Sequence, residues 1–178
     1  MLVPRGSVPV VGVSRRCSSV TGANLSVMTD APLPPAETAA GTPSDALDRL
    51  RRSTRGTLIE RMGIELLEVA ADRAVATMPV AGNTQPYGLL HGGASAVLAE
   101  TLGSCAAMVH AGEGRAAVGI ELNATHHRSS RAGLVTGTAT ALHLGRSTAS
   151  YEIVVVDPDS VRLCTARLTC MLIDDPRP

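Results

Sequence analysis

The sequence predicts an α+β domain in which an antiparallel sheet wraps around one long central helix. Residues 94–109 are small or apolar with few exceptions, which is typical of a helix buried in a core. Two strand-like segments precede this stretch and four follow it, and short turns join the segments. Because segments joined by short turns pair antiparallel, and because no other segment is long and apolar enough to be covered, the sheet is expected to enclose this helix.

The elements before the central helix follow from local patterns. Ser44 as a helix cap, followed by leucines at helical spacing, predicts one or two short amphipathic helices up to Met62. Strands are expected at 64–69 and 73–80, joined by a short turn. The composition of 81–88 (AGNTQPYG) predicts a loop that leads into the central helix.

Glycines mark both ends of the central helix. The helix is expected to begin at His91-Gly92-Gly93 and to end before the glycines of 112–114. Turn-forming residues then separate four further strands. These strands are expected at 116–126, 133–142, 148–156 and 162–173.

The chain divides into a tail and one domain. Its 178 residues suffice for a single sizeable core. Residues 1–45 are rich in Ser, Pro, Thr, Ala and Gly and show no hydrophobic period, so we predict a disordered tail followed by one domain at 46–178. Residues 2–7 read LVPRGS, a thrombin cleavage sequence of the kind introduced with an expression tag, so part of the tail can be foreign to the protein.

Charge and aromatic content argue against nucleic acid as a partner. The 16 basic residues balance 16 acidic ones, and the only aromatic residues are Tyr87 and Tyr151. Binding to a phosphate backbone needs a positive surplus, and single-strand binding needs stacking rings. All 16 basic residues are arginine, which excludes every reaction that uses a lysine amine.

Cysteine and histidine spacing predicts a reduced, metal-free protein. Cys164 and Cys170 fall on one expected strand, where six residues span roughly 20 Å, too far for a disulfide. No histidine pair has metal-ligand spacing, so neither a metal nor another cofactor is expected. The apolar stretch is shorter than the roughly 20 residues of a membrane span, so we expect a core helix, no membrane association and a cytoplasmic location.

Glu100 is the one acidic side chain of the central helix. A carboxylate among apolar neighbours is costly unless it is paired or used, and such a group suits a general base. Two alternatives stay open: Glu100 lies on a solvent-facing stripe, or an arginine from elsewhere neutralises it.

The helix start is a second candidate. Consecutive glycines there allow a ligand to approach the backbone, and their free N–H groups lie at the positive end of the helix dipole. Such groups can form an oxyanion hole. The alternative is that Gly92 and Gly93 serve only close packing.

These two features cannot act together within one subunit. Glu100 follows Gly92 by eight residues, which is roughly 12 Å along a helix. If both are catalytic, the glutamate that faces a given oxyanion hole must come from another subunit, whose helix runs antiparallel alongside. Catalysis would then require at least a dimer.

Five segments carry a resemblance to a known family: 77–80 (TMPV), 84–95 (TQPYGLLHGGAS), 98–104 (LAETLGS), 119–123 (GIELN) and 142–146 (LHLGR). They closely resemble the hotdog-fold acyl-CoA thioesterases. The nearest branch is the PaaI-like group, which includes 1,4-dihydroxy-2-naphthoyl-CoA hydrolases of menaquinone synthesis and the proofreading thioesterase of enterobactin synthesis. The resemblance covers about residues 56–173.

The resemblance implies catalytic roles. Glu100 would be the base or nucleophile toward the thioester carbonyl, acting across the dimer, and Gly92 would donate its backbone N–H to the carbonyl oxygen. Gln85 and His91 would polarise or position that oxygen. Ser104, one helical turn after Glu100, would orient the water or the glutamate. Without the resemblance, Gln85 and His91 are better interpreted as a loop-capping amide and a helix-start histidine.

Coenzyme A carries phosphates, and two basic turns offer arginine for bidentate contact with them. The alternative is an ordinary solvated turn, which weighs about equally for Arg131. The candidate binding residues are Gly93, Thr101, His126, Arg128, Ser129, Arg131, His143, Gly145 and Arg146.

The sequence therefore predicts a thioesterase that hydrolyses an acyl-CoA with an aromatic acyl group, such as 1,4-dihydroxy-2-naphthoyl-CoA. Two alternatives stay open: a thioesterase for acyl-carrier protein, and a hotdog protein that binds acyl-CoA without turnover. A homodimer is the smallest assembly expected, and the resemblance implies a homotetramer built from two dimers.

Overall fold

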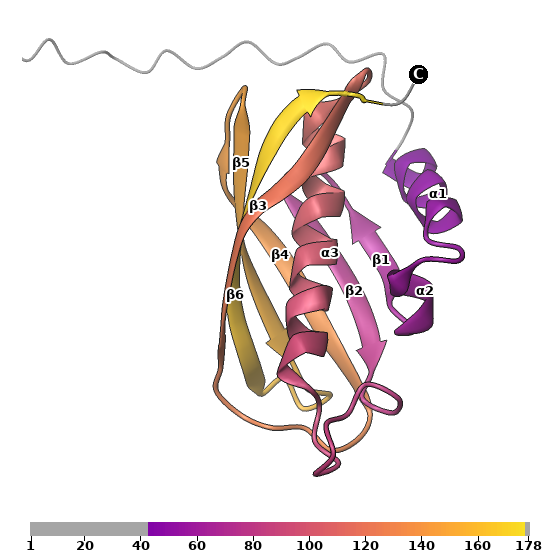
Figure 1. Cartoon of the computed structure of the whole chain (residues 1–178), viewed down its shortest axis with the longest axis vertical. Coiled ribbons are helices and arrows are strands. Elements are labelled where there is room, and N and C mark those ends of the chain that lie inside the picture. The colour runs from indigo at the N-terminus through magenta and orange to yellow at the C-terminus, as the bar shows by residue number, and fades with distance from the viewer. Residues whose placement is uncertain (1–42, 177–178) are drawn as a thin grey trace, which may run out of the picture. The chain divides into compact units, whose positions relative to one another are not determined.

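The computed structural model describes residues 43–176, and these form a curved sheet around one long helix (Figure 1). Almost all of the tail predicted at 1–45 lies outside the described residues. The first helix begins at Pro43, so Ser44 lies inside it and is not its cap. The elements are α1 (Pro43–Ser53), α2 (Leu58–Arg61), β1 (Glu65–Val69), β2 (Arg73–Pro79), α3 (Gly92–Ala111), β3 (Arg115–His126), β4 (Leu134–Leu144), β5 (Thr148–Val156) and β6 (Arg162–Asp174).

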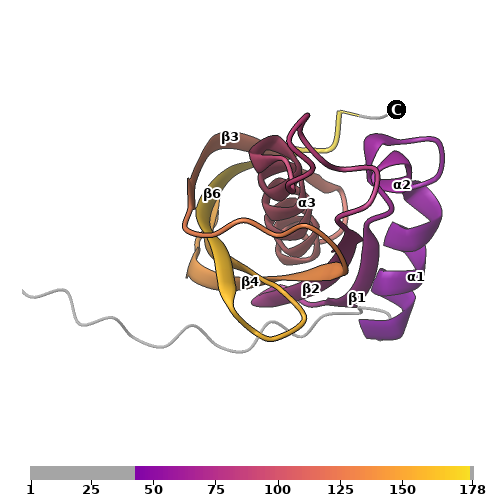
Figure 2. The same ribbon diagram turned by 90° about the horizontal axis from the view of Figure 1, so that it is seen from below.

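The six strands form one antiparallel sheet in the order β1-β2-β4-β5-β6-β3. Seen end-on, the sheet curls around α3 (Figure 2), which confirms the predicted architecture. β1 and β3 are the two edges of the sheet. The bounds of all six strands agree with the predicted ones to within two residues, because turn-forming residues separate them.

Small residues let α3 lie close against the sheet. Leu98 and Leu102 of α3 are fully buried, and Gly137 of β4 lies beneath them. A Cβ on Gly137 would come within 2.6 Å of Leu102 Cδ1, so a larger residue there would displace these leucine side chains. With 20 residues, α3 is longer than the apolar stretch expected from the sequence, and by length and composition alone it could cross a membrane. The sheet nevertheless curls around α3 and buries much of it, which is typical of the core helix of a folded domain.

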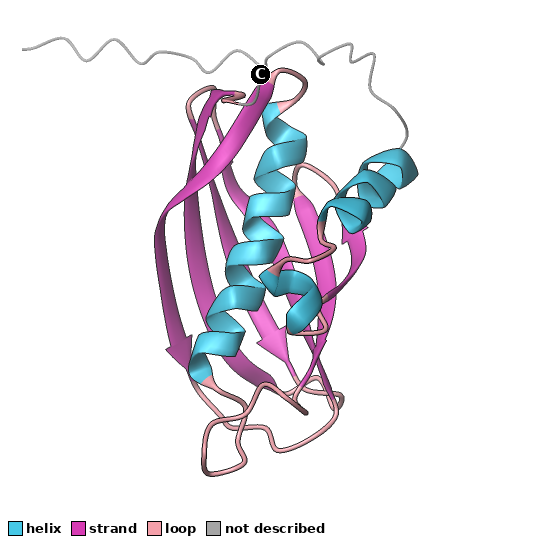
Figure 3. Cartoon of the chain, turned by 45° about the vertical axis from the view of Figure 1, so that its right-hand side comes forward, coloured by secondary structure: helices cyan, strands magenta, loops and turns pink. Residues whose placement is uncertain are grey.

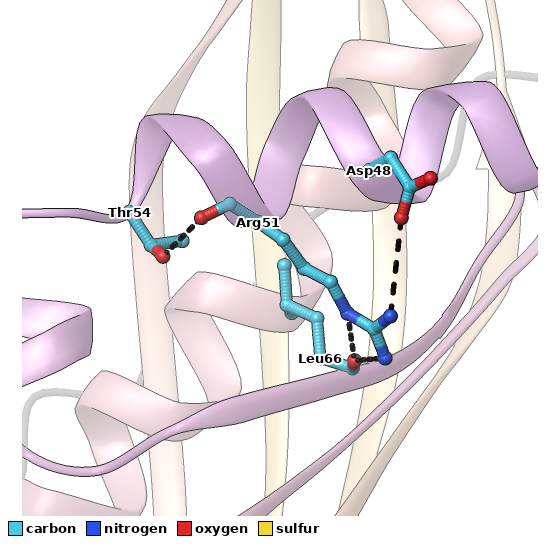
Figure 4. A network of polar contacts seen from close by, with 4 residues as sticks. All are labelled: Asp48, Arg51, Thr54 and Leu66. Carbon is cyan, nitrogen blue, oxygen red and sulfur yellow. Dashed lines mark hydrogen bonds and ion pairs between the residues drawn. The ribbon is translucent and has the colours of Figure 1, made fainter.

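The edge strand β1 is covered by α1, which lies apart from α3 (Figure 3). Arg51 of α1 donates from Nε and Nη2 to the carbonyl oxygen of Leu66, at 3.0 and 2.7 Å (Figure 4). Leu66 lies at an irregularity in the β1–β2 register. The guanidinium therefore satisfies a strand-edge carbonyl and fixes α1 to the sheet.

Candidate active site

A closed loop between β2 and α3 carries Gln85. The Gln85 N–H donates to the Leu89 carbonyl at 2.9 Å, and the Gly88 N–H donates back to the Gln85 carbonyl at 2.9 Å. Gly88 has a φ of +73°, a conformation that glycine adopts without strain. A bridge between Thr84 and Leu90 closes the loop, so Gln85 is presented from a short, internally bonded turn.

His91 caps the start of α3. Its Nδ1 accepts a hydrogen bond from the Gly93 N–H at 2.8 Å, so this N–H is occupied, contrary to the expectation that both glycines keep theirs free. Because Nδ1 accepts, the proton of the neutral imidazole is on Nε2. Among the described residues, the N–H of Gly92 has no acceptor. Gly92 alone therefore retains an N–H at the positive end of the helix.

Gly92 also allows close packing at the helix start, which is the alternative role named for it in the sequence analysis. A Cβ at Gly92 would lie 2.9 Å from Nε2 of His126, the last residue of β3. The imidazole thus lies directly against the first turn of the helix. The following residue, His127, lies just beyond β3, and its Nε2 is 2.9 Å from Thr165 Oγ1.

A pocket of about 350 Å³ opens at this helix start. The helix dipole and Arg128 make its electrostatic environment favourable for an anion. The pocket brings together five residues predicted from the sequence, and it adds others that the sequence analysis did not single out. Its lining consists of Gln85, Leu89, Leu90, Gly92, Ser95, His126, His127, Arg128, Ser129 and Leu163.

Some of the pocket residues that the sequence analysis did not single out could have been identified from the sequence, and others could not. Ser95 is buried and follows Gly92 by three positions, so helical spacing could have identified it. Leu163 comes from β6, and no local pattern connects it with the helix start. Tyr87 is 79% exposed and does not line the pocket.

Glu100 does not line this pocket. It is exposed in the subunit, not buried as expected, and it lies beside Gly119 of β3. Its Oε1 is 3.3 Å from the place where a Cβ of Gly119 would stand. The solvent-facing alternative therefore describes the single subunit, in which Glu100 forms no ion pair with any described residue.

Ser104 shares this part of the helix, and Cys170 of β6 lies near both polar side chains. Burial raises the pKa of the Cys170 thiol, a hydrogen bond with Ser104 lowers it, and the charge of Glu100 raises it further. Thr101, by contrast, is buried and lies outside the pocket. The stripe of α3 that carries Glu100 and Ser104 therefore faces the β3–β6 side of the sheet.

The second basic turn lies at the other end of α3. His110, in the last turn of α3, contacts the carbonyl of Gly145 through Nε2 at 2.9 Å. Arg115 donates to the carbonyl of Arg146 at 3.0 Å. A 20-residue helix is about 30 Å long, so one subunit does not bring His143, Gly145 and Arg146 to the pocket at Gly92. Arg131 is exposed and also lies outside the pocket lining.

Within residues 43–176 no three His, Cys, Asp or Glu side chains gather as a metal site would require. The three cysteines in this part of the chain, Cys105, Cys164 and Cys170, are buried free thiols.

A curved antiparallel sheet around a single enclosed helix is the hotdog fold. An unpaired amide at the start of that helix and a free carboxylate further along it suit the hydrolysis of an acyl thioester. The fold and the site therefore define a hotdog-fold thioesterase.

Comparisons with known proteins agree. Residues 87–164 match the model of the thioesterase superfamily. The chain is 48% identical over 124 residues to the proofreading thioesterase EntH of Cronobacter turicensis, covering 69% of this chain and 90% of that protein. The structure of thioesterase HI1161 from Haemophilus influenzae is similar with a TM-score of 0.70 and 37% identity, over 74% of this chain and 92% of the other. The E. coli PaaI protein from the phenylacetic acid degradation operon is similar with a TM-score of 0.65 and 25% identity, over 74% and 96%.

The chain belongs to the thioesterase superfamily, and within it to the PaaI-like hotdog thioesterases. It is a thioester hydrolase. Proteins of this family typically form oligomers.

Proposed function

We propose that the protein hydrolyses aromatic acyl-CoA thioesters at a site shared by two subunits, with the pocket at Gly92 from one and Glu100 from the other. The main support for this proposal is the distance between Gly92 and Glu100. Both lie on the continuous helix α3, eight residues and therefore roughly 12 Å apart, and Glu100 does not line the pocket. One carbonyl carbon cannot be in reach of both within a subunit.

The edge strand β3 supports a dimer of the required geometry. It is 12 residues long, no strand among the described residues pairs with its outer side, and it exposes apolar side chains, with Ile120 56% and Val118 38% exposed. Long unpaired edges with apolar residues tend to pair with another chain. A two-fold axis that pairs β3 with its copy also makes the two α3 helices antiparallel, as a shared site requires.

The chemistry then follows from the groups available. The Glu100 carboxylate either takes a proton from a water that attacks the thioester carbonyl or attacks that carbon itself. The carbonyl oxygen becomes an oxyanion, to which the N–H of Gly92 donates, with Gln85 and the Nε2–H of His91 nearby. Collapse of the adduct breaks the carbon–sulfur bond. In the general-base route the CoA thiolate takes up the proton that Glu100 received from water, and the free acid leaves. In the nucleophilic route an acyl–Glu100 anhydride remains, which a water hydrolyses, and the thiolate takes up a proton from that water. Ser104 would orient the water or Glu100.

If the two α3 helices are antiparallel, basic turns from both subunits can bind the same CoA molecule. Arg128 lines the pocket at the start of α3, and Arg146 lies at the far end of the helix in the same subunit. In the proposed dimer the partner's helix runs past the start of this one and ends roughly 16 Å beyond it, so the partner's Arg146 lies on the same side as Arg128 and extends the phosphate-binding region along CoA.

The acyl group is proposed to be aromatic. Relatives that are 45–50% identical are named proofreading thioesterases EntH, and this favours a proofreading role over one in menaquinone synthesis, with its 1,4-dihydroxy-2-naphthoyl ester. The apolar lining of the pocket comes from Leu89, Leu90 and Leu163, which suits a planar apolar group. A cytoplasmic location and a tetramer of two dimers belong to this proposal.

The test is hydrolysis by E100Q and by the matched control E113Q. Glu113 is an exposed acid in the loop after α3. Release of free CoA from benzoyl-CoA by E100Q should fall by about 10²–10⁴-fold, whereas E113Q should match the wild type. Equal activity of E100Q and wild type would refute the proposal. Faster turnover of benzoyl-CoA than of hexanoyl-CoA supports the aromatic preference, and faster turnover of the same acyl group on a carrier protein would favour that alternative donor.

A further inference from the structure

We propose that Asn83 is a positioning residue, which sets the loop of Gln85 and the start of α3 relative to the rest of the fold. This inference rests on the proposed function, because it concerns the groups assigned there to the carbonyl oxygen. It adds a residue that does not line the pocket and that no reasoning from the sequence identified as functional.

The side chain of Asn83 joins two elements. Its Nδ2 donates to the carbonyl of Met62, which ends α2, at 2.8 Å, and to the carbonyl of Pro79, which ends β2, at 2.8 Å. Both hydrogens of the amide are therefore used. Gly63 packs closely against the Pro79 ring, so the two carbonyls belong to one compact anchor.

The backbone of Asn83 connects this anchor to the helix start. Its carbonyl accepts from the His91 N–H at 2.9 Å, and its own N–H donates to Val80 at 3.0 Å. His91 in turn holds the Gly93 N–H through Nδ1. A continuous path of hydrogen bonds thus leads from the ends of α2 and β2 to the turn of backbone that contains the Gly92 N–H.

Few other contacts hold this loop. The Leu90 N–H donates to the Ser130 carbonyl at 2.8 Å, and the backbone hydrogen bonds that residues 84–89 form with other described residues lie within the loop itself. Hydrogen bonds therefore fix the loop at two points, Asn83 and Leu90, of which Leu90 also packs against the core and Asn83 is the one nearer to Gln85. Loss of its side chain would let Gln85 and the Gly92 amide shift together, and small misplacements of catalytic groups cost large factors in rate.

The experiment compares N83A with Y151F at a temperature at which both are folded. Tyr151 donates its hydroxyl to the Ala71 carbonyl at 2.8 Å, at the turn between β1 and β2, so Y151F also loses a side chain–backbone bond, but away from the pocket. We expect N83A to lower kcat at least about tenfold with KM within about twofold, whereas Y151F keeps kcat. Exchange of the His91 and Gly93 amides should accelerate only in N83A. If N83A does not fold, N83S, which retains one donor, replaces it and should show a smaller loss of kcat.

Gln85→Ala separates this inference from the proposed function. If Q85A lowers kcat and the Q85A/N83A double variant loses less than the product of the two single losses, Asn83 acts in part through Gln85, and the further loss beyond Q85A belongs to the Gly92 amide, as proposed. If Q85A lowers kcat but N83A behaves like Y151F, the inference is overturned and the proposed site stands. If Q85A has no effect while N83A lowers kcat, the role of Gln85 fails and the positioning of the helix start is supported. If neither variant changes kcat, the inference about Asn83 and the role of Gln85 are both refuted, while the roles of Glu100 and Gly92 are decided by E100Q and G92A.

Discussion

The carboxylate of Glu100 lies over Gly119, with Oε1 3.3 Å from the position that a Cβ would take. An added methyl group would therefore displace the carboxylate by a few tenths of an ångström. We expect G119A to lower kcat by roughly three- to tenfold with little change in the free energy of unfolding. Steady-state kinetics together with urea denaturation measure the two quantities.

Gly137→Ala is the matched control for this variant. Its Cβ would lie 2.6 Å from Leu102 Cδ1 in the core, away from Glu100, so G137A should lose stability by about 1–3 kcal/mol and keep kcat per folded molecule. An unchanged kcat in G119A would mean that the position of this carboxylate does not matter.

Gly92→Ala should act at the other half of the site. Its Cβ would lie 2.9 Å from His126 Nε2, so the imidazole or the first turn of α3 must move. We expect kcat to fall by about 10-fold or more, because the N–H of Gly92 moves with its backbone. The double variant G92A/H126A, which removes the obstructing ring, should recover part of the loss. No difference in kcat between G92A and the wild type would contradict the assignment of this amide.

Arg51 is expected to fix α1 to the sheet. R51A removes both donors to the Leu66 carbonyl, and because the side chain is partly exposed the expected loss of unfolding free energy is about 1 kcal/mol. Arg52 is the control, since it lies exposed on the same helix and the described residues offer it no partner. Equal stability of R51A and R52A in urea denaturation would show that the contact contributes nothing.

Cys105 should make stability fall at high pH. Burial raises its pKa from the ordinary 9.0 to about 11. The unfolded chain loses this proton near pH 9 and the folded chain retains it to about pH 11, so its contribution is full below pH 9 and is lost as the pH rises through this window, by on the order of 2–3 kcal/mol.

The measurement for Cys105 is urea denaturation at pH 8 and pH 10.5. C105A should lose less stability between the two values than the wild type. Some loss should remain, because burial also raises the pKa of Cys164, Cys170 and Tyr151. An identical loss in C105A and wild type would rule out this thiol as a source of the pH dependence.

The fold could be predicted from the sequence because its signals are local. β5 occurs at the predicted residues, and β3 and β6 each extend one residue beyond, since turn-forming residues separate the strands. The order of the strands in the sheet was not predicted, because it depends on contacts between distant segments.

The site was predictable in part. Gln85, Gly92, His126, Arg128 and Ser129 come together as pocket residues. The occupied N–H of Gly93 depends on a side-chain conformation that no spacing reveals. The exposure of Glu100 was one of the alternatives left open, because an apolar helix sequence does not tell which side the sheet leaves uncovered.

Complementation between two inactive subunits tests the shared site most directly. E100A and Q85A, each expected to be nearly inactive alone, are co-expressed with different tags and purified by both. In a mixed dimer one site combines Gln85 of one subunit with Glu100 of the other and is intact, while the second site lacks both. The mixed dimer should recover up to about half of the wild-type kcat. Mixed dimers that form but are no more active than either variant would contradict a site built from two subunits.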